Sequence, residues 1–158
     1  MTPEPAPTAA APRPLTADEE AVVRSLPHLV HALPRAIDAA LVQGQRLPLT
    51  EYLALMHLSE APGRRLRMGD LADACEMSLS GTTRVVHRLE GEGFVRRHRC
   101  DEDGRGWHAA LTDAGLARLE EAWPAHLAAI RRHLLDHLAG LDLPAVAAAF
   151  RNVATERP

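Results

Sequence analysis

Apolar residues recur every three or four positions between residues 22 and 41, which predicts an amphipathic helix. Thr16, with Glu19 three positions later, has the pattern of a capping box, so we expect this helix to begin at Thr16. Pro27 and Pro34 lie inside the pattern. Because proline removes a backbone hydrogen bond from a helix interior, we expect a kink or a restart at these two positions.

Three shorter helical patterns follow. Thr50 is a candidate N-cap for a second helix that Pro62 ends, a third helix is expected over Met68–Glu76, and a fourth begins at Ser78. Two short helices joined by a tight turn form the outline of a helix-turn-helix. The side chains expected to face inward are Leu71, Ala72 and Cys75 in the third helix and Thr82, Val85, Val86 and Leu89 in the fourth.

The hydrophobic period changes after the fourth helix. Residues 94–100 and 107–111 are predicted to form two strands, and the acidic, glycine-containing segment 101–106 is predicted to be the tip of a hairpin between them. A hairpin that directly follows a helix-turn-helix is a β-wing.

Two further helices complete the pattern. Thr112 is expected to cap a long helix that ends at Gly140, and a last helix is expected over Leu143–Ala154. The predicted fold class is mainly α with a small β-wing, that is, a winged helix-turn-helix plus a helical dimerisation layer. The first, long and last helices carry more apolar surface than a wing of this size can cover, which favours a homodimer. The apolar residues expected to face inward in the long helix are Leu116, Leu119, Trp123, Leu127, Ile130, Leu134 and Leu138.

The composition is that of a soluble chain, with 46% hydrophobic and 25% charged residues. No run of about 18 apolar residues is present, so no membrane association is expected. The N-terminus lacks the pattern of a signal peptide, and two cysteines are too few for a disulfide scaffold, so we expect a cytoplasmic location. Arginine is used without lysine, which suggests a GC-rich, bacterial genome. The proline- and alanine-rich residues 1–15 are predicted to be a disordered tail.

The charge is unevenly distributed. The net charge is −3, yet residues 78–100 hold five arginines and two glutamates. Short hydroxyl groups and arginines on one helix face are suited to base edges and phosphates in a major groove. A cation in the wing, such as Arg97 or Arg105, is suited to the adjacent minor groove. The polar face of the fourth helix consists of Ser80, Thr83, Arg84, His87 and Arg88.

Several of these positions fall in one motif-bearing run. The motif residues are Leu71 and Ala72, Ser80, Thr83 and Arg84, Arg88 to Glu90, Gly93, Asp103 and Arg105, and Leu111 and Thr112. With them, residues 66–115 resemble the MarR (multiple antibiotic resistance regulator) family of winged-helix repressors, and the helices on either side extend the resemblance to about residues 18–155.

The resemblance implies a two-fold symmetric dimer that binds pseudopalindromic double-stranded DNA, usually as a repressor. It further implies a DNA-binding lobe at 49–111 between dimerisation segments at 16–48 and 112–158. His87 stands where members often have Asp, and Gly104 stands where many have a second Arg, so the resemblance does not fix the base preference or the grip of the wing. His87 is either a DNA contact or a surface residue with no role. The expected DNA-binding residues are Ser78, Ser80, Thr82, Thr83, Arg84, His87, Arg88, Arg97, Asp103 and Arg105.

The resemblance also implies an effector, which is either a small molecule or a metal; no cofactor is required. Nine histidines make zinc a candidate, and His57, His126, His133 and His137 are the candidate ligands. No cysteine or carboxylate obviously completes a tetrahedral site, so scattered surface histidines are the competing interpretation. Cys75 falls on an apolar helix face and is expected to belong to the core rather than to act as a redox sensor.

Two other classes of function remain to be weighed. The chain lacks the sequence patterns G-x-S-x-G, G-x-x-x-x-G-K-S/T and G-x-G-x-x-G, so an enzyme is not expected. A winged-helix module that binds protein instead of DNA is the second alternative. The first alternative is the zinc-responsive repressor, with a sensor site made of histidines.

Overall fold

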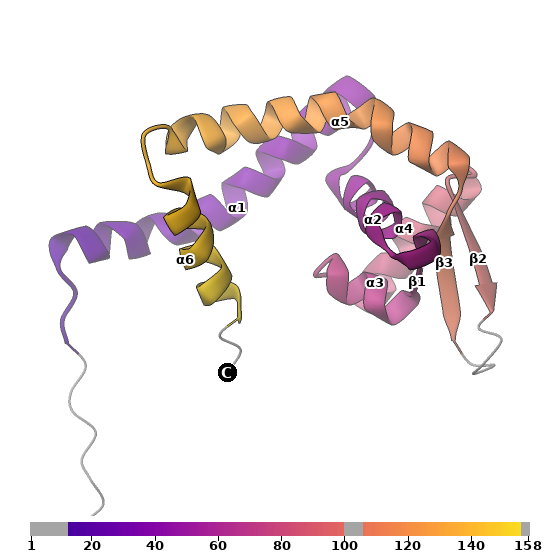
Figure 1. The fold of residues 1–158 in the computed structure, drawn as a ribbon, viewed down its shortest axis with the longest axis horizontal. Helices are drawn as coiled ribbons and strands as arrows, with labels where there is room; N and C mark the ends of the chain where they lie inside the picture. The colour runs from indigo at the N-terminus through magenta and orange to yellow at the C-terminus, as the bar shows by residue number, and fades with distance from the viewer. Residues whose placement is uncertain (1–12, 100–105, 156–158) are drawn as a thin grey trace, which may run out of the picture. The chain divides into compact units, whose positions relative to one another are not determined.

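The structure, a computed structural model, describes residues 13–99 and 106–155 and is shown in Figure 1. The chain divides into two compact units, residues 1–32 and 33–158. Helix α1, Ala17–Gln45, begins in the first unit and ends in the second.

In the first unit, α1 begins with the expected capping box. The Thr16 backbone N–H donates to Oε2 of Glu19 at 2.7 Å, and the Glu19 N–H donates back to Oγ1 of Thr16 at 3.3 Å. The restart expected at Pro27 and Pro34 does not occur, since both prolines lie within one helix. A proline removes only its own hydrogen bond, and the flanking residues continue the helix past it.

The second unit contains the remaining helices and strands. Figure 1 shows them in chain order by colour. They are α2 (Leu49–Glu60), the 3₁₀ turn η1 (Pro62–Arg64), β1 (Arg65–Arg67), α3 (Met68–Ala74), α4 (Leu79–Gly91), β2 (Val95–Arg99), β3 (Trp107–Leu111), α5 (Asp113–His133), the 3₁₀ turn η2 (Leu135–Leu138) and α6 (Leu143–Thr155).

The two wing strands are confirmed, but the sheet has a third strand that the sequence pattern did not reveal. The order is β1-β3-β2, and both pairings are antiparallel. In β1, Leu66 lies opposite Ala109. With only three residues, β1 is too short to show a strand period, and its partner β3 lies about 40 positions away, so only the tertiary structure identifies it.

The core of this unit lies between α2, α3, α4 and the sheet, with α5 across α2. The inward faces predicted for α3 and α4 are all buried. Because the apolar positions of the helix-turn-helix face this core, its polar positions face solvent. The largest fully buried side chains include Tyr52, Leu55, Leu58, Leu71, Val86, Leu89 and Val95.

Helix α2 begins one residue before the predicted N-cap. Thr50 lies inside the helix, and Pro48 is the N-cap residue, with no capping side chain of its own. Oδ1 of Asp38, on α1, instead accepts the Leu49 N–H at 2.8 Å. A carboxylate from elsewhere in the chain therefore replaces the local cap, which local sequence cannot show.

Helix α5 is shorter than predicted. Thr112 caps it as expected, since its Oγ1 accepts the Gly115 N–H at 3.0 Å. The helix ends at His133 because Leu134 leaves helical geometry at φ −135°, ψ −66°. Its buried residues include alanines, whereas Trp123 and Leu127, expected to face inward, are 51% and 36% exposed.

Candidate nucleic-acid interface

The N-terminus of α4 is stabilised by serine side chains. Oγ of Ser78 accepts the Gly81 N–H at 3.2 Å, and it lies 3.2 Å from Oγ of Ser80. Both serines are exposed. The first turn of α4 is therefore capped and presents short hydroxyl groups to solvent.

The outward face of α4 is polar, as predicted. Ser80, Thr83, Arg84, His87 and Arg88 are all exposed. Oγ1 of Thr83 donates to the Leu79 carbonyl oxygen at 2.8 Å. Arg84 makes no hydrogen bond or ion pair with the described residues, so its guanidinium remains available to an outside acceptor.

Thr82 does not belong to this face, and its burial does not support the DNA contact expected from it. Its side chain is 1% exposed, and its Oγ1 donates to the Ser78 carbonyl oxygen at 3.2 Å. It lies on the same side of α4 as Val85 and Val86, which pack in the core. A threonine on the buried side of a helix satisfies its hydroxyl on the preceding turn and cannot reach a ligand.

Arg88 is exposed but already paired. Its Nε lies 2.7 Å from Oε1 of Glu51, a residue of α2 whose side chain is 7% exposed. Burial raises the pKa of Glu51, and the Arg88 cation opposes that rise. The pair ties the end of α4 to α2, so the DNA contact expected from Arg88 competes with a structural contact.

A second ion pair ties α4 to the wing. Nε of Arg97 donates to Oε2 of Glu90 at 2.7 Å, and the Arg97 backbone N–H donates to Oε1 at 3.2 Å. Desolvation acts to raise the pKa of Glu90, but the Arg97 hydrogen bonds outweigh it and the pKa lies below its usual value. Helix α4 and the wing are therefore held together by charge. Asp103 and Arg105 lie outside the described residues.

A groove of about 550 Å³ separates the two helices from the wing. The start of α3, Leu79 and Thr83 of α4, and Arg97 and Trp107 of the wing line it. Trp107 was not among the residues predicted for this site, although a tryptophan at the start of the strand that follows an arginine-rich strand is visible in the sequence.

The four candidate zinc ligands are not brought together. His57 lies on α2, His126 and His133 on α5, and His137 in η2. Within residues 13–99 and 106–155, no group of three or more His, Cys, Asp or Glu residues could hold a metal ion. Cys75 is buried, and burial raises the pKa of its thiol, as suits a core residue.

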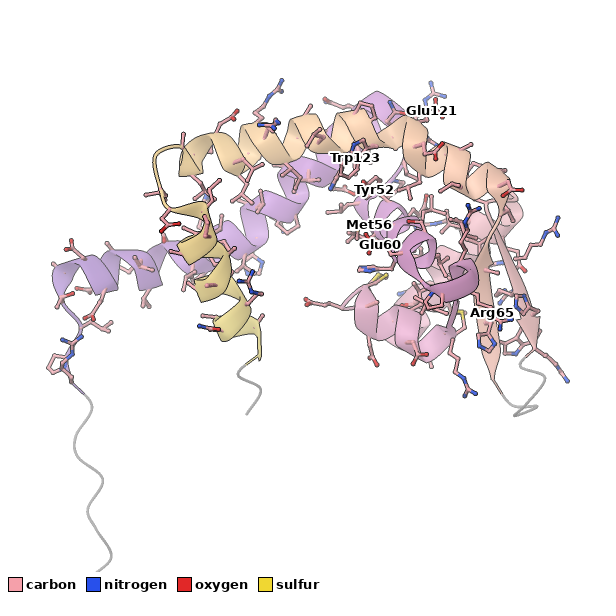
Figure 2. All side chains as sticks on the ribbon, viewed as in Figure 1. Tyr52, Met56, Glu60, Arg65, Glu121 and Trp123 are labelled. Carbon is pink, nitrogen blue, oxygen red and sulfur yellow. The ribbon has the colours of Figure 1, made fainter. Side chains whose placement is uncertain are left out.

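His126 instead stacks on Tyr52, with ring centroids 4.2 Å apart. Figure 2 shows Tyr52 on α2 beneath α5, near Trp123. Neither the Tyr52 hydroxyl nor Nδ1 of His126 has a hydrogen-bond partner among residues 13–99 and 106–155, although both atoms are buried. Burial raises the pKa of Tyr52 to about 12 and lowers the pKa of His126.

The order of these elements defines a class. A helix pair with an exposed polar second helix, followed by an antiparallel hairpin that pairs with a short strand before the first helix of the pair, is a winged helix-turn-helix. No helix in the described part of the chain is long and apolar enough to cross a membrane.

Comparison with known proteins gives the family. Residues 47–106 match the family model described as MarR family. Sco3205 of Streptomyces coelicolor, a MarR family transcriptional regulator solved in complex with DNA, is 36% identical, with a TM-score of 0.82 over 93% of both chains. AbsC of the same organism, also a MarR family transcriptional regulator, is 35% identical, with a TM-score of 0.78 over 90% of this chain and 96% of that one. The chain therefore belongs to the MarR family of transcriptional regulators.

Curated relatives agree with this assignment. The transcriptional repressor MprA of Escherichia coli K12 is 29% identical over 84 residues, which cover 53% of this chain and 48% of MprA. The HTH-type transcriptional repressor YetL of Bacillus subtilis is 33% identical over 87 residues, 55% of this chain and 52% of YetL. The matches thus span about half the length of these curated relatives.

Proposed function

We propose that this chain is a cytoplasmic transcriptional repressor that binds pseudopalindromic double-stranded DNA as a homodimer. The observation that carries the proposal is the exposed face of α4, on which Ser80, Thr83 and Arg84 project from a capped N-terminus next to a cationic wing. An α-helix with this face fits the major groove of B-form DNA.

The contacts divide by chemistry. Arg84 suits the two acceptors of a guanine, Thr83 suits a base edge, and the hydroxyls of Ser78 and Ser80 suit phosphate oxygens. His87 lies further along the same face. Arg97 and the tip residues Asp103 and Arg105 belong to the wing, which is suited to the neighbouring minor groove. The complex of Sco3205 with DNA supports this use of the fold.

Exposed apolar side chains support the homodimer. Most of them occur in α1, α5 and α6, outside the lobe at 49–111 that carries the polar face, where Leu79 and Trp107 are also exposed. Burying such surfaces between two copies removes them from water, and two-fold symmetry lets one surface serve both subunits. We therefore assign 16–48 and 112–158 to dimerisation. The exposed large apolar residues of these helices are Val22, Val23, Leu26, Leu29, Val30, Val42, Trp123, Leu127, Leu143, Phe150 and Val153.

Two buried polar atoms that find no hydrogen-bond partner in the described part of the chain support a small-molecule effector. The Tyr52 hydroxyl and Nδ1 of His126 lie between α2 and α5, where no group of metal ligands is gathered among the described residues. A buried polar atom is stable only when hydrogen-bonded. A ligand with hydroxyl, amide or carboxylate groups supplies the missing partners and acts where the DNA-binding lobe meets α5.

Selection of bound sequences from random duplex DNA tests the proposal. We expect recovery of an inverted repeat whose half-sites lie about 34 Å apart, and affinity that falls steeply with salt. Arg84→Ala should lower affinity by about 1–3 kcal/mol and relax the preference at one base pair of each half-site. Arg96→Ala, which removes an exposed arginine outside this face, is the matched control. Recovery of no consensus, or a flat salt response, would favour the protein-binding alternative.

A further inference from the structure

The indole ring of Trp107 contacts the guanidinium groups of two arginines. The guanidinium carbon of Arg97 lies 5.8 Å from the indole centroid, and that of Arg99 lies 5.7 Å from it. Both distances are within the range of a cation–π interaction. An exposed tryptophan by itself does not indicate a binding site. Trp107, however, contacts two arginine side chains close to α4, the helix proposed to bind DNA.

The strand register places all three side chains on one side of the wing. Arg99 lies opposite Trp107, and Arg97 lies opposite Ala109. Residues directly opposite in an antiparallel pair share a face, and that face recurs at every second position. On this face, Val95 and Ala109 are buried in the core. The three side chains therefore continue the core-facing side of the wing beyond the core.

This side of the wing faces the groove next to the recognition helix. Trp107, which is 46% exposed, lines the groove together with Arg97 and Thr83. Asp70 lines the same groove from α3. Arg67, at the end of β1, lines the groove beside Asp70, so charges of both signs lie at the start of α3. Arg97 lines the groove from the wing and Arg99 lies on the same face of the sheet, so this side carries positive charge and favours an anion.

The two arginines are not equivalent. Arg97 is paired with Glu90 at 2.7 Å, so its charge is largely compensated within the protein. Arg99 is exposed, and among the described residues it has no acidic partner; Trp107 is the contact that orients it. Arg99 is thus a cation held by an aromatic ring with its charge still available to a polyanion.

We propose that Trp107 is a positioning residue of the DNA interface, which holds Arg99 so that its guanidinium contacts a backbone phosphate of the DNA strand passing Thr83. This inference rests on the proposed DNA binding and adds two residues to the interface. The occupant is the sugar–phosphate backbone, because the uncompensated charge on this side of the groove is positive and the neighbouring helix face is the one proposed to read bases.

Tryptophan fluorescence tests the placement directly, because the chain has only two tryptophans. In Trp123→Phe, all tryptophan emission comes from Trp107. We expect saturating cognate duplex to change this emission and to reduce its quenching by acrylamide. Trp107→Phe, which leaves Trp123 on α5 as the emitter, is the matched control and should show a smaller reduction in quenching.

Coupled substitutions test the role. Arg99→Ala should weaken DNA binding about fivefold and reduce the log–log salt slope by about 0.9. Trp107→Leu should weaken binding about threefold in the wild-type background and have less than about a twofold effect in Arg99→Ala, because the ring acts through Arg99. Trp107→Phe keeps a ring face and should recover part of the loss. Arg96→Ala, three residues before Arg99 in β2 and therefore on the opposite face of the strand, should bind like the wild type.

The outcomes separate the two proposals. Unchanged quenching of Trp107 at saturating DNA, or additive effects of Trp107→Leu and Arg99→Ala, would overturn the positioning role while DNA binding stands. Equal losses of DNA affinity in Arg96→Ala and Arg99→Ala would also overturn the positioning role, because the face of β2 on which an arginine lies would then make no difference. A wild-type protein that binds no duplex in the selection would remove the proposed function and this role together.

Discussion

Gly115, in the first turn of α5, is the glycine among the described residues at which an added Cβ would meet its neighbours most closely. Its N–H donates to the capping Oγ1 of Thr112, and that hydroxyl also lies 3.0 Å from the Phe94 carbonyl oxygen, directly before β2. The start of α5 is therefore packed against the start of the wing. A Cβ at Gly115 would lie 2.7 Å from Cδ1 of Leu111 and closer still to the carbonyl oxygen of Phe94.

Gly115→Ala should therefore be destabilising, although alanine is the better helix former by about 1 kcal/mol. Carbon atoms pack at about 3.5 Å or more, so the first turn of α5 must move by roughly 1 Å against a backbone carbonyl that cannot rotate away. Overpacking of this kind costs about 3 kcal/mol. For a chain of this length the loss corresponds to a fall of roughly 6–12 °C in Tm.

Urea and thermal unfolding followed by circular dichroism measure this effect. Gly69→Ala is the matched control, because Gly69 also lies in the first turn of a helix and a Cβ there meets nothing within 4 Å. It should raise stability by about 0.5 kcal/mol. A Gly115→Ala protein as stable as Gly69→Ala would refute the reasoning from close packing between α5 and the wing.

Three further outcomes follow from single contacts. Arg88→Met leaves the Glu51 carboxylate buried without a cation and should lower the free energy of unfolding by about 2 kcal/mol at neutral pH. The loss is smaller than for a fully buried pair because Arg88 is more than half exposed. Adding Glu51→Gln should recover most of the loss in urea unfolding, and no recovery would contradict the ion-pair explanation. His126→Phe preserves the stack on Tyr52 and removes a buried nitrogen for which the described residues provide no partner, which should raise the free energy of unfolding by about 1 kcal/mol. Burial lowers the pKa of His126 from 6.5, so the unfolded chain binds this proton more readily than the folded chain does. The free energy of unfolding of the wild type should therefore fall as the pH drops below 6.5, and His126→Phe should show a smaller fall over the same range. Parallel pH profiles of the two proteins would contradict this assignment. Thr82→Val should leave DNA affinity within about twofold of the wild type in a binding titration, whereas a larger loss would return Thr82 to the interface.

Much of the DNA-binding lobe could be predicted because its signals are local. The caps at Ser78 and Thr112 each accept a backbone N–H three residues later, so a few neighbouring residues are enough to recognise them. The buried side of α4 follows from the helical period, and the polar side that carries Arg84 follows with it. The same period placed Thr82 on the buried side, as the structure has it, whereas the DNA contact expected from Thr82 came from the family resemblance and its burial does not support it.

The errors have one physical cause, which is that the deciding partner lies far away in the chain. Strand β1 exists only because Leu66 meets Ala109. The start of α2 depends on Asp38, eleven positions before the residue it caps. Which apolar residues of α5 are buried depends on how closely α2 approaches, and there the small alanines are covered while Trp123 is left exposed.

Sequence alone determined the helices, the wing and the family to which they belong, because hydrogen-bonded caps and hydrophobic periods act over a few residues. Tertiary structure decided which arginines are paired with protein carboxylates and which remain available for DNA. Arg88 is paired with Glu51 across two helices, Arg97 is paired with Glu90, and Arg99 is directed by an aromatic ring on the opposite strand. The sequence shows that every arginine is charged. Whether a carboxylate of the protein neutralises that charge depends on distances that only the folded chain sets.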